Sequence, residues 1–146
     1  RLALLLAVLE RRVGLDLSGV DVYATAVGGV QVTEPGSDLP LALAVVSAAT
    51  NRCLVAQVVA CGEVGLGGEV RQVAGLERRL HEAHRLGFNR AILPASAPEP
   101  PAGMTAVRVD TLADAVVAAG LSPGPAGSGV VVSADPVVST EPPPMG

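Results

Sequence analysis

Short strand-like segments alternate with helix-like segments along most of this chain, and this order limits its possible folds more than any other feature. Leu54–Cys61 is an apolar run rich in β-branched residues, short enough for a buried central strand. Leu76–Leu86 places apolar residues on one face and arginines and glutamates on the other, which is typical of a surface helix, and Gly87 ends it. Strands interleaved with helices over residues 1–121 predict one domain of the α/β class.

The remaining elements follow from the same periodicities and from turn-forming residues. We predict further helices over residues 2–13, 39–50 and 112–120, and further strands over residues 21–27, 30–33, 69–73, 90–93 and 105–109. A glycine pair between the first two of these strands predicts a hairpin, and Gly14 is expected to stop the first helix. Side chains that accept hydrogen bonds precede two of the helices, as helix caps do. The candidate caps are Ser37 or Asp38 for the second helix and Asp110 or Thr111 for the last.

The composition changes after Leu121. The last 25 residues hold six of the twelve prolines and show no periodic apolar face. We therefore divide the chain into a folded domain over residues 1–121 and a flexible, Pro/Gly-rich tail over residues 122–146. The chain also begins at Arg1 within a helical pattern and without a methionine, so we expect it to be a piece of a longer protein.

The absence of lysine excludes several kinds of chemistry. All ten basic residues are arginine, so Schiff-base catalysis, a phosphate-loop lysine and a serine–lysine dyad are impossible. The net charge of −4 argues against a surface devoted to nucleic acid, although a local basic patch is compatible with it. The only aromatic residues are Tyr23 and Phe88, too few to stack the bases of a single strand.

Hydropathy and cysteine content favour a cytoplasmic protein with no membrane contact. The longest uninterrupted apolar runs, Leu2–Leu9 and Pro40–Val46, are far shorter than the roughly 18 residues that a membrane-spanning helix needs. Cys53 and Cys61 have no CxxC partner, and two cysteines cannot form a structural zinc site. We interpret both as small buried hydrophobic residues in a reducing compartment, and we expect no metal site.

Three features could carry chemistry, and each also has a purely structural interpretation. The glycine-rich segment Gly62–Glu69 could cradle a phosphate, but its carboxylates would repel one, so a tight turn is the better interpretation. His81 and His84 would need a third ligand to hold a metal, and a solvated helix face explains them as well. Ser37 precedes a helix, where a nucleophile can lie next to helix N-terminal amides, but simple capping accounts for it equally.

Arginines on the predicted helix 76–86 form a possible cationic strip for contact with duplex DNA or a neighbouring subunit. Glutamates on the same helix, Glu77 and Glu82, are close enough to neutralise part of it. The candidate DNA contacts are Arg78, Arg79 and Arg85, with Arg71 and Arg90 as secondary candidates.

Three sequence blocks, in order, resemble a known family. Cys61–Pro94, with its Gly-Glu dipeptide, strand, amphipathic helix and strand ending in proline, looks like the corresponding block of Lon-type proteases. The stretch from Arg1 to about Leu121 more closely resembles the C-terminal Lon-protease-like domain of RadA (Sms) DNA repair proteins. The matching blocks are RLALLLAVLERRVGL, VYATAVGGVQVTEPGSDLPLALAVVSAATNR and GEVGLGGEVRQV.

The resemblance implies a Lon proteolytic-domain-like fold of the ribosomal protein S5 domain 2-like type, with two layers, a mixed sheet and flanking helices. It also places the degenerate dyad positions. Ser37 falls approximately in register with the serine loop of active Lon proteases, and the lysine position falls on Glu77. A carboxylate cannot serve as the neutral amine base of such a dyad, so we expect no proteolytic activity and no enzymatic activity in this fragment.

The resemblance further implies a role in a ring-forming DNA motor. In such proteins the Lon-like domain is a platform for a homohexamer and helps to contact duplex or branched DNA during branch migration. The ATP, magnesium and zinc of the family would belong to a preceding part of the protein, so we expect no cofactor here, and only weak DNA binding. Two alternatives stay open: a residual hydrolase using Ser37 with His81 or His84 as base, and a regulatory Lon-like domain outside DNA repair.

Overall fold

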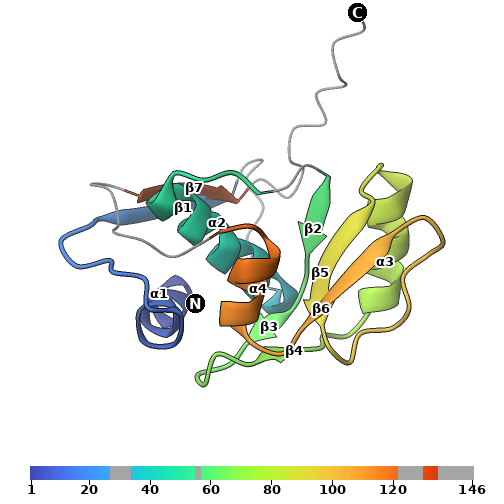
Figure 1. Cartoon of the computed structure of the whole chain (residues 1–146), viewed down its shortest axis with the longest axis horizontal. Coiled ribbons are helices and arrows are strands. Elements are labelled where there is room, and N and C mark those ends of the chain that lie inside the picture. Colours follow the sequence, from blue (N-terminus) through green and yellow to red (C-terminus); the bar gives the residue numbers. More distant parts are fainter. Residues whose placement is uncertain (27–33, 55–56, 122–129, 135–146) are drawn as a thin grey trace, which may run out of the picture.

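A parallel three-stranded sheet lies between layers of helices in the computed structural model, which describes residues 1–26, 34–54, 57–121 and 130–134 (Figure 1). The strand order is β2-β5-β6, with β2 at Val58–Ala60, β5 at Arg90–Pro94 and β6 at Thr105–Val109. Ile92 at the middle of β5 is in register with Ala60 and Val107. Because parallel strands need crossover connections, the helices lie on the faces of this sheet.

Helices cover both faces of the sheet, and the side-chain alternation of the strands explains how. Ile92 points into a core shared with α2 (Asp38–Thr50) and α4 (Leu112–Ala118), whereas Ala91 and Leu93 point into a second core beneath α3. The second core contains Leu76 and Leu80 of α3 (Leu76–Arg85). The predicted α/β class and the flanking helices are thereby confirmed.

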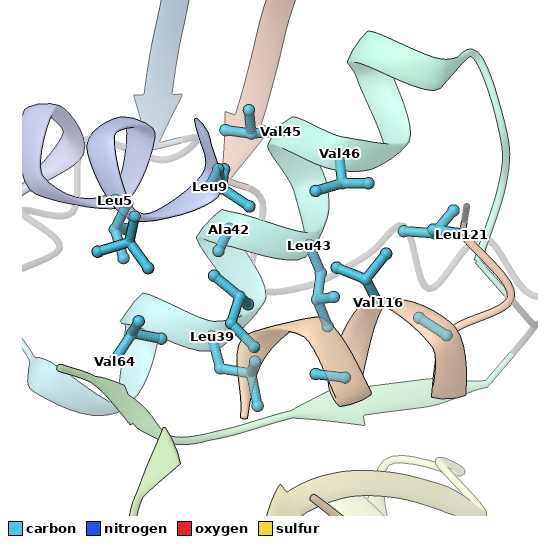
Figure 2. Close-up of a cluster of buried hydrophobic side chains, with 14 of the residues drawn as sticks. Leu5, Leu9, Leu39, Ala42, Leu43, Val45, Val46, Val64, Val116 and Leu121 are labelled. Atoms are coloured by element: carbon cyan, nitrogen blue, oxygen red, sulfur yellow. The ribbon is translucent and has the colours of Figure 1, made fainter. Parts of the chain in front are cut away.

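The first core is the larger one and joins the N-terminal helix to the rest of the domain. Figure 2 shows Leu5 of α1 (Leu2–Val8) and Leu9 of the following π-helical turn η1 (Leu9–Val13) facing α2. Leu43 of α2 and Val116 of α4 fill the space between these helices. The side chains of Leu5, Leu9, Leu43 and Val116 are at most 1% exposed, so this contact excludes water almost completely.

Two smaller sheets complete the described part of the chain. β3 (Glu63–Val64) and β4 (Val70–Arg71) form an antiparallel hairpin, so antiparallel pairing occurs next to the parallel sheet and not within it. β1 (Val22–Ala26) pairs in parallel with β7 (Val130–Ala134), against which α2 packs. Residues 130–134 therefore form a strand inside the segment for which the sequence predicted no regular structure. Their pairing with β1 is a long-range contact, which local periodicity cannot reveal.

Two predicted helix ends are confirmed, and one predicted cap is wrong. Gly14 ends the N-terminal helix in the left-handed conformation at φ 81°, and Thr111 Oγ1 accepts the Asp114 N–H at 3.1 Å as the cap of α4. Neither Ser37 nor Asp38 caps α2 through its side chain. Instead, the Gly62 carbonyl oxygen accepts the N–H of Leu39, because the turn before α2 packs against that backbone.

Several further predictions need adjustment. The strand expected over residues 54–61 is limited to β2, and the one over residues 69–73 to β4. Cys53 is exposed in the loop after α2, so its interpretation as buried was wrong, whereas Cys61 is buried as expected. The hairpin predicted around residues 27–33 lies outside the described residues. In the described part of the chain, no helix is both long enough and apolar enough to cross a membrane.

Truncation of Leu43 should be costly because this side chain fills the centre of the larger core. We expect Leu43→Ala to lower the free energy of unfolding by about 2–5 kcal/mol, the range for a leucine truncated without full collapse of the cavity. Val117→Ala on the exposed face of the neighbouring helix α4, where Val117 is 75% exposed, is the matched control and should change it by less than about 0.5 kcal/mol. Guanidinium unfolding measures both, and equal effects would contradict this packing.

Candidate functional site

A groove of about 580 Å³ lies between α3, strand β2 and the turn before α2. Its floor is apolar and comes from β2 and the buried face of α3, including Val59, Leu80 and Ala83. Ser37, in the short 3-10 turn η2 (Pro35–Ser37), lies at one end, and Phe88 closes the other. The groove combines an apolar floor with a few polar side chains at its edges, and for that reason it is the candidate site.

The wall formed by α3 is cationic because two successive arginines line it. Arg79 forms an ion pair with Glu34, which directly precedes the η2 turn, so the helix is tied to the segment that carries Ser37. A Cβ atom at Gly36 would lie 3.2 Å from Nη1 of Arg79 and 3.0 Å from Sγ of Cys61. The turn therefore approaches the helix so closely that any side chain at position 36 would force these neighbouring side chains to shift. No local pattern predicts this ion pair, because Glu34 and Arg79 are 45 residues apart.

Cys61 lies at the base of the groove, directly beneath the η2 turn. Burial raises the pKa of its thiol, and the nearby Arg79 guanidinium offsets only part of that effect. The thiol is therefore protonated at neutral pH, which makes it a poor nucleophile. Cys61 belongs to the apolar floor of the groove, and its thiol does not contribute reactivity.

A buried carboxylate fixes the turn from below. Asp38 is 2% exposed and forms a two-pronged ion pair with Arg1, in which Nε donates to Oδ1 at 2.7 Å. The same carboxylate accepts the backbone N–H of Val64 in β3 at 3.1 Å. Three segments thus converge on Asp38, which sequence reasoning treated only as a possible helix cap.

The glycine-rich segment forms the turn of the β3–β4 hairpin, as its structural interpretation predicted. Gly65 N–H donates to the Glu69 carbonyl at 2.9 Å, and Gly68 adopts φ +84°. The pKa of the Glu69 carboxyl lies below its ordinary range. The largest cause is a hydrogen bond from the backbone N–H of Glu69 itself, followed by the Arg71 side chain. A carboxylate charged at neutral pH therefore occupies the turn, an arrangement that does not suit a phosphate.

The structure does not bring the proposed hydrolase residues together. Ser37 lines the groove, but neither His81 nor His84 does, and no hydrogen bond joins Ser37 to an imidazole among the described residues. His81 Nδ1 lies 2.9 Å from the Glu77 carbonyl oxygen on its own helix. His84 faces the loop between β5 and β6, where a Cβ at Gly103 would lie 3.1 Å from its Nε2.

The two degenerate dyad positions, Ser37 and Glu77, do not share the groove. Glu77 is exposed on α3 and does not line the groove, whereas Arg78 and Arg79 do. The cationic groups next to Ser37 are therefore guanidinium groups, which stay protonated and cannot act as a general base.

The five candidate DNA contacts do not form one cluster. Three lie on α3, but Arg85 is paired with Glu82 at 2.5 Å, as the sequence predicted, and Arg79 is paired with Glu34. Arg78 is exposed and has no ion-pair partner among the described residues. It is therefore the member of this group that is most available to a phosphate.

The two secondary candidates lie at opposite ends of the sheet. Arg90 begins β5 at the amino end of the parallel strands. Arg71 lies in β4 at the carboxyl end, because the Val70 N–H of the same strand donates to the Asp110 carbonyl just beyond β6. Arg71 is also paired with both glutamates of the hairpin, Glu63 and Glu69.

Two further arginines, which are not among the predicted site residues, lie at the end of the N-terminal helix. Arg11 and Arg12 are exposed on η1 and have no ion-pair partner within residues 1–26, 34–54, 57–121 and 130–134. The charged run that begins at Glu10 and continues with these two arginines is visible in the sequence. It follows a strongly apolar helix, so it predicted only the end of that helix and not a site. Within the same described ranges, no group of three His, Cys, Asp or Glu side chains could hold a metal ion.

Comparison with known proteins relates most of the chain to DNA repair proteins. The chain is 50% identical over 118 residues to the DNA repair protein RadA of Salmonella typhimurium (strain LT2), an alignment that covers 80% of this chain and 26% of that protein. The identity to RadA of Escherichia coli K12 is 48% over 118 residues, with the same coverage of both chains. The identity to RadA of Mycolicibacterium smegmatis is 41% over 116 residues, which cover 80% of this chain and 25% of that protein.

The chain therefore spans about a quarter of the length of these relatives. A second family, described as subunit ChlI of Mg-chelatase, matches residues 28–97. That match includes the η2 turn, β2 and α3, which line the groove, together with α2, the β3–β4 hairpin and β5.

The two cysteines should differ sharply in reactivity. At about pH 8 we expect iodoacetamide to modify exposed Cys53 at least about tenfold faster than Cys61, because Cys61 is both covered and largely protonated. Raising the pH should accelerate the reaction of Cys61, since the thiolate fraction increases toward its raised pKa. Mass spectrometry of timed samples measures both rates. The rates should converge in denaturant, and equal rates in the folded protein would contradict the burial of Cys61.

Proposed function

We propose that this chain is the Lon-like assembly and DNA-contact domain of a RadA-type DNA repair ATPase, without protease activity. The observation that carries the proposal is the 41–50% identity to relatives named DNA repair protein RadA over 80% of the chain. In this proposal the domain supports a homohexameric ring of a cytoplasmic protein and touches duplex or branched DNA during branch migration. ATP hydrolysis, with its magnesium, and any zinc site belong to the part of such a protein that this chain does not include.

The Lon-like assignment is supported by the order of the elements from the η2 turn to β5. A serine-bearing turn, a Gly-Glu hairpin, an amphipathic helix and a strand ending in Pro94 follow one another in the order of the Lon-type block. The turn and the helix meet across the groove, where the Arg79–Glu34 ion pair joins them. This is the pair of elements that would carry a serine and a lysine in an active relative.

The absence of protease activity follows from the side chains that occupy these elements. Ser37 has arginines beside it, and the chain contains no lysine that could replace them. A guanidinium cannot accept the serine proton at neutral pH, and Glu77 lies outside the groove. The groove therefore keeps the architecture of a hydrolase site without a base.

DNA contact in this proposal is weak for a single copy and gains from repetition. The chain carries a net charge of −4, and most arginines on the candidate surface are paired with carboxylates. One ring of copies would present Arg78 several times, and linked weak contacts add to a much higher overall affinity. Sequence identity to DNA repair proteins also favours this role over that of a regulatory domain outside DNA repair.

The oligomeric state tests the proposal as a whole. Sedimentation of the 146-residue chain should give the mass of six copies at high protein concentration, and addition of duplex DNA should shift the boundary further. The control is double-stranded DNA in high salt, where the second shift should disappear because phosphate contacts are screened. A monomer at every concentration would contradict the ring, and an unshifted boundary at low salt would contradict the DNA contact.

The salt dependence of binding tests which arginine meets the phosphates. Each phosphate contact contributes about 0.9 to the slope of log affinity against log salt concentration. Arg78→Ala should lower the slope by about 0.9 per copy bound, whereas Arg85→Ala on the same helix is the matched control and should lower it less, because Arg85 is already paired with Glu82. Fluorescence anisotropy with labelled duplex measures the slope. Equal slopes for Arg78→Ala and the unmodified chain would remove Arg78 from the interface.

A further inference from the structure

We draw no further inference here: the strongest candidate, the surface patch where the exposed Arg11 and Arg12 of η1 adjoin the glycine turn of the β3–β4 hairpin, would only extend the DNA contact already proposed, and nothing among the described residues shows what covers it.

Discussion

The buried carboxylate of Asp38 joins three segments that are distant in the sequence, and the arrangement of the groove depends on it. The Asp38 side chain is 3% exposed, and its partners are the guanidinium of Arg1 and the backbone N–H of Val64. A buried carboxylate is costly unless it is paired and hydrogen-bonded, so the segments that supply the partners must come together. The start of α1, the start of α2 and strand β3 are thereby held at one point.

Asp38 directly follows the η2 turn, which lines the groove. The Gly36 carbonyl of this turn accepts the Gly62 N–H at 3.0 Å, so the turn, the base of the groove and the hairpin form one connected backbone unit. On the far side of the turn, Arg79 pairs with Glu34 and secures α3. The groove is thus maintained by the Arg1–Asp38 and Arg79–Glu34 ion pairs, neither of which involves Ser37 or a histidine.

The sequence predicted the regular elements well where the pattern is local. The amphipathic helix α3, the strand ending at Pro94 and the cap at Thr111 all depend on residues within a few positions of one another. The groove, the buried role of Asp38 and the pairing of β1 with β7 depend on contacts between distant segments, for which a single sequence carries no periodic signal. The prediction that Cys53 is buried was wrong for a related reason. The exposure of a small apolar residue in a loop after a helix depends on distant contacts and leaves no local pattern.

Amide hydrogen exchange at Val64 tests the role of Asp38 most directly. In Asp38→Ala the Val64 N–H loses its acceptor, and a lost hydrogen bond to a charged group corresponds to about 1.5–3 kcal/mol. The account predicts that exchange at Val64 accelerates by at least about tenfold, together with a loss of global stability of similar size. In the same variant the Asp114 N–H, which Thr111 caps, should change only with global stability. Unchanged protection at Val64 and unchanged stability would contradict the central place given to Asp38.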